Sequence, residues 1–368
     1  MLKICFVIPR TYYLFNPDTK NHEDKVGGAQ KQTYLLSTEL AKDPDFDVSF
    51  CMADFGQAKF EIRENVKLRN AFSFDDPLIK RTCKLFKTLK NINADTYIFR
   101  SPDVGVAVAV FYLKVFLRKK ILYMIAGDME TTRARLTRYT GKITSLCMNY
   151  VYKKVDILTA QTIHQAQQFS LARKRVPNSV IKNIYPPIDT LVDLSLKKEI
   201  LWVGRLDKIK NPELFLKLAQ KFPYERFVMI APVVRDAEEF GKKIQQSAKT
   251  ISNLTLVEYV EPSEMSSFYL KSKMYVLTSD FEGFSNTMAE AMQAQCPVLS
   301  YNVNPDNILN DFNSGICAEG DINRFFEAFE YLNSNSDAAL NLGINAAHYI
   351  RIHHGLKENS TLFKKCLI

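Results

Sequence analysis

The sequence predicts an α/β protein with two Rossmann-like domains, each built on a parallel sheet. Short apolar segments with strand character alternate with segments of helical length along nearly the whole chain. This alternation is interrupted by a proline-containing stretch, RVPNSVIKNIYPPID at 175–189, and then begins again. The length of 368 residues exceeds what one hydrophobic core usually serves, which agrees with two domains.

The first domain is expected to span residues 1–190. Helical segments, among them 29–42 and 134–154, separate its strands, so the pattern is that of consecutive βαβ units. The expected strands are KICFVIP at 3–9, DVSFCMA at 47–53, DTYIFRS at 95–101, KILYMIA at 120–126 and DILTAQ at 156–161.

The second domain is expected to span residues 191–350. Helices begin at NPE (211–213) and at NTMAEAMQA (286–294), where Asn286 or Thr287 is the expected N-cap. Ligands of parallel sheets bind at the carboxyl ends of the strands and between the domains, so residues that follow strands are candidate site residues. The expected strands are 199–205, 226–232, 254–260, 272–279 and 296–301.

The cysteine pattern and the hydropathy of the sequence indicate the compartment in which the protein is expected. The seven cysteines are scattered without a C-x-x-C pair, which predicts reduced thiols in a reducing compartment. The longest apolar stretch, VGVAVAVFYL at 104–113, is shorter than the roughly 18 residues of a membrane span. The apolar run near the N-terminus is too short for a signal peptide. We therefore expect a cytoplasmic protein.

The net charge of +9 is concentrated in the first half of the chain. Residues 1–195 hold 30 Lys and Arg against 19 Asp and Glu, whereas the remainder holds 19 against 21. Basic segments at 80–90, 117–120 and 133–142 suit a phosphorylated acceptor or an anionic membrane surface, although ordinary solvated helix faces also explain them. A nucleic-acid partner is not expected, because no nucleic-acid-binding motif accompanies the charge.

Glycines precede a helix in the first domain. Gly27 and Gly28 stand before the helical segment 29–42, where backbone N–H groups can approach a phosphate. A simple turn explains the same pair. The chain has neither a G-x-G-x-x-G fingerprint nor a P-loop, which disfavours a nicotinamide dehydrogenase and a P-loop kinase.

Charged residues follow two strands of the second domain. Gly204 and Arg205 follow one strand, and Arg205 and Lys210 are placed to converge on a diphosphate, unless both simply face solvent. In LTSDFEGFSNTMAEAMQAQ, Glu282 lies in a loop and Glu290 about one turn into the next helix. An anionic diphosphate at the helix N-terminus would have Glu282 on one side and Glu290 toward hydroxyls, which is the layout of a nucleotide sugar. The alternative is two surface carboxylates.

GRLDKIKN, followed some seventy residues later by EGFSNTMAEAMQAQCPVLS, resembles the retaining GT-B glycosyltransferases of family 4, the glycosyl transferases group 1. Glu282 and Glu290 match the E-x7-E spacing of that family. VGGAQKQTYLLSTELAK, KKVDILTAQTIHQAQQF and VNPDNILNDFNSGICAEGD resemble further family segments, so the likeness covers most of the chain. It implies two sheets facing across a cleft and a C-terminal helix, at about 351–368, that packs back on the first domain.

The resemblance also implies roles for individual residues. Arg205 and Lys210 would neutralise the donor diphosphate, Glu290 would bind ribose hydroxyls, and Glu282 would lie beside the transferred sugar. We expect neither metal nor cofactor, because these cations and the helix terminus can stabilise the leaving diphosphate. The expected donor-binding residues are Gly27, Gly28, Gly204, Arg205, Lys210, Glu258, Tyr259, Val260, Glu282, Gly283, Phe284, Ser285, Asn286, Thr287 and Glu290, with Glu258, Tyr259 and Val260 near the nucleobase.

One segment departs from the family pattern. Many relatives carry a histidine after the fourth strand, where this chain has Ala126 and Gly127. Asp128 is the nearest polar residue and is expected to orient a sugar hydroxyl or the acceptor as a fourth catalytic residue beside Glu282, Arg205 and Lys210, or else to cap the following segment.

The expected activity is transfer of a hexose from a UDP-sugar or GDP-sugar to a glycan or lipid-linked acceptor, with retention, in cell-surface polysaccharide or glycoconjugate synthesis. Peripheral attachment to the inner face of the membrane is expected with it. The alternatives are a sugar-nucleotide epimerase or hydrolase of the same fold and a non-catalytic subunit that binds sugar nucleotides.

Overall fold

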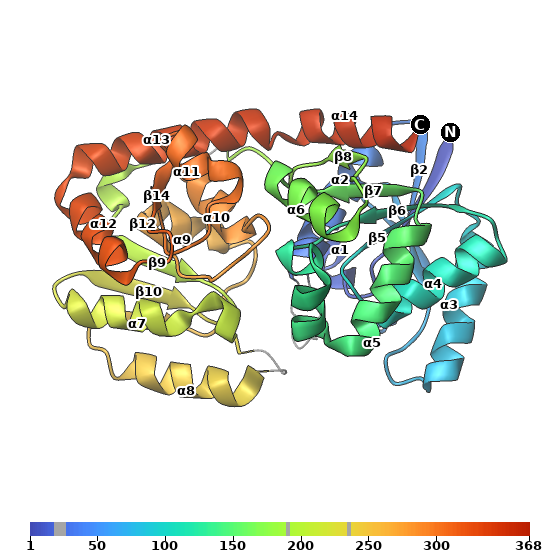
Figure 1. Cartoon of the computed structure of the whole chain (residues 1–368), viewed down its shortest axis with the longest axis horizontal. Helices are drawn as coiled ribbons and strands as arrows, with labels where there is room; N and C mark the ends of the chain where they lie inside the picture. The colour runs from blue at the N-terminus through green and yellow to red at the C-terminus, as the bar shows by residue number, and fades with distance from the viewer. Residues whose placement is uncertain (18–26, 189–191, 234–236) are drawn as a thin grey trace. The chain divides into compact units, whose positions relative to one another are not determined.

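The computed structural model divides the chain into two compact units (Figure 1). The first comprises Met1–Ile184 and Leu356–Ile368, and the second comprises Tyr185–Gly355. The division expected at 190/191 falls outside the described residues. The chain returns to the first unit at Leu356 rather than near residue 351, because the preceding helix continues to His353. The described residues are 1–17, 27–188, 192–233 and 237–368.

An eight-stranded sheet forms the centre of the first unit, in the order β3-β4-β2-β1-β5-β6-β7-β8. Its pairings are parallel except for the antiparallel β3 and β4. All five expected strands are present, and β3, β4 and β8 were not expected because they are short or rich in charged residues. The strands are β1 Leu2–Val7, β2 Phe46–Met52, β3 Phe60–Arg63, β4 Val66–Asn70, β5 Thr96–Arg100, β6 Lys120–Met124, β7 Ile157–Ala160 and β8 Ser179–Val180.

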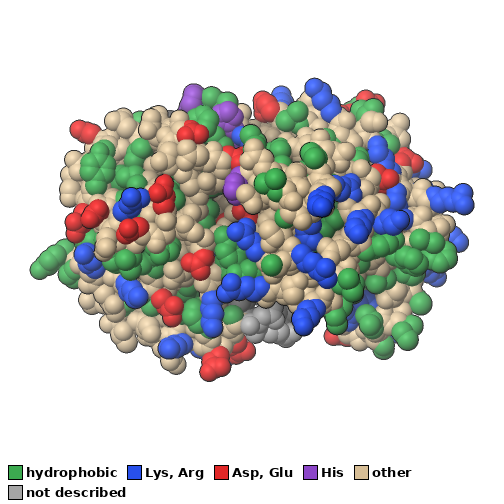
Figure 2. Space-filling view, in the orientation of Figure 1, with side chains coloured by type: hydrophobic (Ala, Val, Ile, Leu, Met, Phe, Trp, Pro, Cys, Tyr) green, Lys and Arg blue, Asp and Glu red, His purple; other side chains and the backbone are tan. Residues whose placement is uncertain are grey.

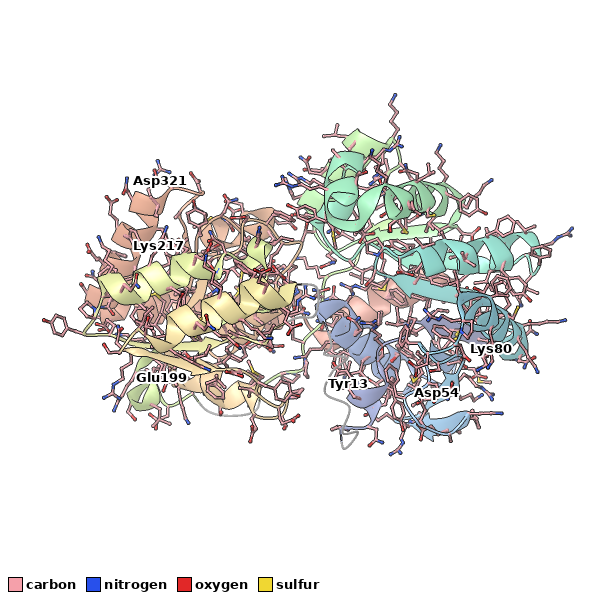
Figure 3. All side chains as sticks on the ribbon, turned by 90° about the horizontal axis from the view of Figure 1, so that it is seen from below. Tyr13, Asp54, Lys80, Glu199, Lys217 and Asp321 are labelled. Carbon is pink, nitrogen blue, oxygen red and sulfur yellow. The ribbon has the colours of Figure 1, made fainter. Side chains whose placement is uncertain are left out.

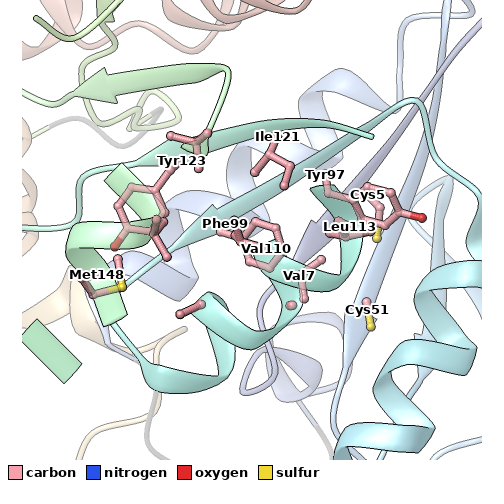
Figure 4. Close-up of a cluster of buried hydrophobic side chains, with 14 of the residues drawn as sticks. Cys5, Val7, Cys51, Tyr97, Phe99, Val110, Leu113, Ile121, Tyr123 and Met148 are labelled. Atoms are coloured by element: carbon pink, nitrogen blue, oxygen red, sulfur yellow. The ribbon is translucent and has the colours of Figure 1, made fainter. Parts of the chain in front are cut away.

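Helices cover both faces of this sheet. The buried side chains of α3, α4 and α5 pack on one face against Cys5, Tyr97 and Tyr123, in the cluster shown in Figure 4. Those of α1, α2 and the C-terminal α14 pack on the other face, where Phe363 is fully buried. The helices are α1 Tyr12–Phe15, α2 Gly28–Leu40, α3 Leu78–Ile92, α4 Val104–Val115, α5 Arg133–Lys154, α6 Ile163–Arg173 and α14 Leu356–Leu367, with a 3₁₀ turn, η1, at Asp128–Glu130.

The second unit contains a six-stranded, fully parallel sheet in the order β11-β10-β9-β12-β13-β14. The five expected strands are present. The sixth, β14, has only three residues and gave no periodic signal. The strands are β9 Glu199–Val203, β10 Arg226–Ile230, β11 Leu254–Val257, β12 Ser272–Leu277, β13 Val298–Ser300 and β14 Gly315–Cys317.

Helices also cover both faces of the second sheet. Side chains of α7, α8 and α12 pack around Trp202 and Phe227, whereas those of α9, α10 and α13 pack around Tyr269 and Tyr275. The α-helices are α7 Pro212–Lys221, α8 Glu238–Lys249, α9 Met265–Lys271, α10 Asn286–Gln293, α11 Ile308–Asp311, α12 Ile322–Ser334 and α13 Ser336–His353, with 3₁₀ turns η2 Leu194–Leu196, η3 Lys208–Lys210 and η5 Pro305–Asn307. Figure 3 shows the side chains of both units and marks Glu199 and Lys217 in this one.

The start of α10 corrects one expectation. Ser285, not Asn286 or Thr287, is the N-cap: its backbone is extended and its Oγ accepts a hydrogen bond from the N–H of Met288 at 3.4 Å. Asn286 is already helical, so the N-cap lies one or two residues earlier than expected. The expected helix start at NPE is confirmed, with Pro212 as the first helical residue of α7.

The apolar stretch at 104–113 forms most of α4, whose N-cap Asp103 accepts a hydrogen bond from the N–H of Gly105 at 2.6 Å. Among the described residues, no helix is both long and apolar enough to span a bilayer.

Candidate active site

The neighbouring strands β9 and β12 are each followed by charged residues that meet in space. Lys210, the last residue of η3, forms an ion pair with Glu282, in the loop after β12, with Nζ and Oε1 2.7 Å apart. The two side chains retain 21% and 14% of their exposure, so the pair is sheltered but reachable from solvent. The structure therefore brings together two of the expected site residues, which are 72 positions apart in the sequence.

Asp207 links Lys210 to Arg205. The carboxylate of Asp207 lies 3.5 Å from Nη2 of Arg205 and also accepts a hydrogen bond from the backbone N–H of Lys210 at 3.1 Å. The Arg205 guanidinium is more than half exposed. Sequence reasoning did not single out Asp207, although an aspartate just before a helical turn is a usual N-cap signal.

The loop after β9 is fastened to the end of β12 through buried polar groups. Nε1 of Trp202 donates to Oγ1 of Thr278 at 2.8 Å, and this hydroxyl donates to the backbone carbonyl of Lys210 at 2.6 Å. A side chain at Gly204 would approach the Trp202 ring to 2.9 Å. Glycine at position 204 thus lets the indole reach Thr278, and the chain of contacts fixes the backbone that carries Lys210.

Glu282 has a second partner. Oγ of the buried Ser279 donates to Oε1 of Glu282 at 2.6 Å, so one carboxylate oxygen accepts from both a hydroxyl and the Lys210 ammonium. Two charge-assisted hydrogen bonds hold the carboxylate in a defined orientation. Gly283, the next residue, is buried.

Small polar residues surround the first turn of α10. Oγ1 of Thr287 lies 2.7 Å from the Tyr275 hydroxyl and 3.1 Å from the Ser285 hydroxyl. The hydroxyl of Tyr185 donates to Oδ1 of Asn286 at 2.6 Å. The amide groups of a helix N-terminus carry a partial positive charge, which makes this segment a favourable place for an anion.

Glu290 lies about one turn into α10. Its Oε2 accepts a hydrogen bond from the hydroxyl of Tyr269 at 2.9 Å. Burial, and then the negative charge of Glu290, raise the pKa of Tyr269 well above its usual value, so the tyrosine stays a hydrogen-bond donor. Phe284, in the preceding loop, is buried and stacks on the ring of His354 with centroids 4.3 Å apart.

The other expected donor-binding residues of the second unit follow β11. Glu258 forms an exposed ion pair with Lys249 at 3.0 Å, and the half-exposed Tyr259 donates to Glu261 at 3.2 Å. Val260 is partly buried and packs against the core cluster that contains Tyr269 and Tyr275. In the first unit, Gly27 is the N-cap of α2 and Gly28 its first residue.

Asp128 opens the 3₁₀ turn η1 after β6 in the first unit. One of its carboxylate oxygens accepts a hydrogen bond from Nε2 of Gln165 at 3.1 Å. Gln165 is fully buried, and its Oε1 accepts from the backbone N–H of Gln161 at 2.8 Å. Asp128 therefore has a fixed partner on α6 rather than only capping its own turn.

Glu130, two residues later, was missed by sequence reasoning. Its fully buried carboxylate accepts hydrogen bonds from the Ala126 N–H at 2.6 Å, the Tyr123 hydroxyl at 2.6 Å and the Tyr152 hydroxyl at 2.7 Å. Burial raises the pKa of the Glu130 carboxyl, against the lowering effect of these donors. The guanidinium of Arg173 donates to the Glu130 carbonyl at 2.9 Å. These buried hydrogen bonds of Glu130 thus fix the backbone of the loop that carries Asp128.

The second unit matches a known protein family. Residues 194–349 match the model of the family described as glycosyl transferases group 1. This match covers almost all of the second unit, including Arg205, Lys210, Glu282 and Glu290.

Relatives extend the likeness into the first unit. An uncharacterized glycosyltransferase of Methanocaldococcus jannaschii is 26% identical over 64% of this chain and 62% of that protein. An alpha-1,4-N-acetyl-D-galactosaminyltransferase of Campylobacter jejuni, named for a glycan acceptor on diNAcBac-PP-undecaprenol, is 23% identical over 86% of this chain and 84% of that protein. The amylovoran biosynthesis glycosyltransferase AmsD of Erwinia amylovora is 23% identical over 82% and 85%.

Solved structures show the fold of the whole chain. Sucrose-phosphate synthase from Thermosynechococcus elongatus superposes with a TM-score of 0.79 at 14% identity, covering 100% of this chain and 98% of that one. Anabaena HepE, solved with UDP and glucose, gives 0.77 at 12% identity, covering 100% and 99%. The whole chain therefore has the GT-B fold of these glycosyltransferase structures, and residues 194–349 of its second unit match the glycosyl transferases group 1 family.

Proposed function

We propose that this chain is a retaining, metal-independent hexosyltransferase that moves a hexose from a UDP-sugar or GDP-sugar to a glycan or lipid-linked acceptor. The observation that carries the proposal is the ion pair of Lys210 and Glu282, held in the loop that leads into α10 and joined through Asp207 to Arg205. Cations and a helix N-terminus are what a diphosphate needs, and a carboxylate beside them suits sugar hydroxyls.

Donor binding would exchange the partner of Lys210. The ammonium turns from Glu282 to the diphosphate, where the exposed guanidinium of Arg205 provides a second cation. The Glu282 carboxylate, still oriented by Ser279, is then available to accept hydrogen bonds from the hexose. Glu290, positioned by Tyr269, accepts from the ribose hydroxyls. Glu258, Tyr259 and Val260 remain our proposal for the nucleobase end, and Gly27 and Gly28 for a backbone contact from the first domain.

The reaction breaks the bond between the anomeric carbon and the diphosphate oxygen and forms a bond from the same carbon to the acceptor oxygen. Lys210, Arg205 and the start of α10 stabilise the charge that grows on the departing diphosphate. Positive charge develops on the sugar ring at the same time, and Glu282 lies beside it. For retention, the acceptor attacks the face that the diphosphate leaves, and its hydroxyl proton passes to a diphosphate oxygen. Asp128 orients a sugar hydroxyl or the acceptor.

The relatives support the acceptor class. The Campylobacter jejuni enzyme acts on a glycan linked to undecaprenol diphosphate, and AmsD is named for synthesis of the polysaccharide amylovoran. We therefore assign this chain to cell-surface polysaccharide or glycoconjugate synthesis, at the inner face of the membrane. HepE binds UDP, which makes a UDP-sugar the first donor to test.

The test is a thermal-shift panel of UDP-sugars, GDP-sugars and the free diphosphates, with a chelator present. A ligand at 100 times its Kd stabilises a protein by about 2.7 kcal/mol, which corresponds to a shift of several degrees. We expect the shift to shrink in Arg205→Ala and Glu290→Ala and to persist in the matched controls Arg226→Ala and Glu199→Ala, at the opposite ends of β10 and β9. If no nucleoside diphosphate stabilises the unmodified protein, the proposal fails.

Product analysis separates transfer from the other reactions of a sugar-nucleotide enzyme. Incubation of the stabilising donor without acceptor should leave it intact, and addition of acceptor should release the nucleoside diphosphate. Free sugar or an epimerised donor in the incubation without acceptor would indicate a hydrolase or an epimerase. Binding without turnover across acceptors, unchanged in Glu282→Gln, would indicate a non-catalytic subunit.

A further inference from the structure

Three neighbouring helices of the first unit carry positive charge and no negative charge. The sequences of α3, α4 and α5 contain twelve Lys and Arg residues and no Asp or Glu. Their buried hydrophobic residues pack in one cluster on the same face of the first sheet, those of α5 from both sides of a break at Gly141, so the three helices line one side of the unit. Figure 2 shows Lys and Arg side chains (blue) and apolar side chains (green) intermixed over the part of the first unit where these helices lie in Figure 1.

The helix α4 occupies the middle of this surface. Tyr112 of α4 stacks on Phe86 of α3 with ring centroids 4.0 Å apart, and Phe111 of α4 contacts Tyr150 of α5 at 6.4 Å. These contacts place α4 between two basic helices. Because α4 itself contains a single charged residue, Lys114, the centre of the surface is apolar and its borders are basic.

The apolar residues of α4 are exposed along one line. Val104, Val108, Phe111 and Val115 follow a spacing of four, three and four residues, which places them on one side of a helix, and all four are exposed. Phe116, just after the helix, is 66% exposed and contacts Phe111. Single exposed apolar residues are common in soluble proteins, whereas a continuous stripe of them marks an interaction surface.

The flanking helices add both kinds of side chain. Ile143 of α5 is 74% exposed and Leu146 is 63% exposed, beside the exposed Lys142. On α3, Ile79 is 80% exposed, and Leu78 precedes it on the same exposed end. Further exposed cations of the two helices are Lys87, Lys90, Arg133, Arg135, Arg138, Lys153 and Lys154.

Some of the positive charge is neutralised locally. Asp76 pairs with Lys80 at 3.2 Å and with Lys84 at 2.6 Å, and Asp156 pairs with Lys114 at 2.7 Å. Both carboxylates lie outside the three helices. The cations farther along α3 and those of α5 therefore set the charge of the surface, because like charges crowded on it are costly unless an anionic partner covers them.

We propose that the outer surface of α3, α4 and α5 binds an anionic lipid bilayer, with Phe111, Phe116, Ile143 and Leu146 entering the interface and the surrounding lysines and arginines facing lipid phosphates. Aromatic and apolar side chains framed by Lys and Arg are the composition of interfacial membrane-binding helices. The inference rests on the proposed function, because a lipid-linked acceptor must be reached at a membrane. A second copy of the chain and nucleic acid are the competing occupants.

The first experiment reports on insertion. Trp202, the single tryptophan, is buried in the second unit and supplies a constant background. We would introduce Phe116→Trp as a reporter and Tyr224→Trp, on an exposed turn of the second unit, as its control. With vesicles of phosphatidylcholine and phosphatidylglycerol, the reporter at position 116 should shift its emission to shorter wavelength and be quenched by brominated acyl chains. Emission that stays unchanged in Phe116→Trp overturns the proposal.

The second experiment tests the charge. The triple variant Lys142→Ser, Lys153→Ser, Lys154→Ser removes three exposed cations from α5, and Lys217→Ser, Lys242→Ser, Lys243→Ser removes three from α7 and α8. Each basic residue near an anionic leaflet changes the partition coefficient about fivefold. Sedimentation should show binding reduced about a hundredfold in the α5 variant and little changed in the control. Equal losses in both variants would show a net-charge effect and overturn the assignment to this surface.

The competing occupants have their own readouts. If Phe111→Ser with Phe116→Ser dissociates an oligomer seen by light scattering and leaves vesicle binding unchanged, the surface is a contact between copies of the chain and the membrane proposal falls. Retention of duplex DNA or RNA in preference to vesicles at equal salt overturns it as well. Donor-induced thermal shifts in the same variants distinguish failure of the membrane proposal from failure of the proposed function. These shifts report on donor binding by the second unit, so they persist if only the membrane proposal is wrong.

Discussion

Glu130 and Glu282 each lie in a loop that follows a strand of a parallel sheet, yet their carboxylates have opposite surroundings. Glu130 is fully buried and accepts from two tyrosine hydroxyls and a backbone amide. Glu282 is partly accessible and pairs with the Lys210 ammonium. A buried carboxylate with neutral donors cannot exchange its partners without losing the fold around it, whereas an accessible ion pair can exchange one partner for a ligand. Glu130 thus supports a loop, whereas Glu282 can exchange its partner for a ligand, as the proposed function requires.

Substitution of Lys210 should produce the largest effect on activity. In Lys210→Ala the growing charge on the diphosphate loses a fixed cation, so kcat should fall about 10²–10³-fold, or about 3–4 kcal/mol in the activation free energy. The free energy of unfolding should change by about 1 kcal/mol or less, because the pair is partly solvated. The measurement is the initial rate of nucleoside diphosphate release with a cell-envelope lipid extract as acceptor. Lys217→Ala on the outer side of α7 is the control, and equal rates in the two variants would contradict the role of Lys210.

Substitution of Glu130 should have the opposite effect, with a large loss of stability and little loss of donor binding. Glu130→Ala leaves the hydroxyls of Tyr123 and Tyr152 and the Ala126 N–H without their acceptor, at a cost of about 3 kcal/mol or more in the free energy of unfolding of the first unit. Calorimetry should show the transition of the first unit lowered by several degrees, while donor binding to the second unit persists. A variant that melts like the unmodified protein would show that the network does not support the loop.

The same carboxyl predicts a pH dependence. Burial raises the pKa of Glu130 above its ordinary 4.5. The stability that Glu130 contributes is therefore fully present at pH values below its pKa in the unfolded state. It is lost as the pH rises through its higher pKa in the folded state. Glu130→Gln imitates the protonated form and titrates nowhere, so the difference in Tm between unmodified protein and variant should favour the unmodified protein most near pH 4 and shift toward the variant at neutral pH. A difference that is constant from pH 4 to 8 would contradict the raised pKa.

The same comparison shows what the sequence could reveal. The meeting of Lys210 with Glu282 was accessible to prediction, because each lies in a loop that follows a strand and strand ends of a parallel sheet meet at one edge. The roles of these residues and of Arg205 and Glu290 stay predictions. The partners that fix the carboxylates were not accessible to prediction, because Tyr269 reaches Glu290 across 21 residues and Tyr152 reaches Glu130 across 22. Such contacts depend on how helices pack, which no local pattern specifies.

The remaining differences between prediction and structure arise where the local sequence fits more than one structure. Ser285, Asn286 and Thr287 are all good N-caps, and the choice among them depends on where the backbone turns helical, so the prediction was one or two residues late. The edge strand β3, FEIR, is largely exposed, so it lacks the apolar run by which the buried strands were found. Asp128 was noted for its position after β6, but only the structure shows its contact with Gln165.

The smallest effect we predict concerns Tyr269, which holds Glu290 in place as Ser279 holds Glu282. Tyr269→Phe removes one hydrogen bond to a carboxylate and leaves Glu290 itself, so UDP binding should weaken about tenfold, or about 1.4 kcal/mol. Titration calorimetry with UDP and with 2′-deoxy-UDP shows whether the lost affinity depends on the ribose hydroxyl. The variant should lose affinity for UDP and should lose much less affinity for the deoxy form. Tyr275→Phe, which removes a buried hydroxyl bonded to Thr287, is the matched control and should preserve the preference for ribose. Equal losses for the two nucleotides in Tyr269→Phe would show that Glu290 does not recognise the ribose, and would leave Glu290 as part of the scaffold in the same sense as Glu130.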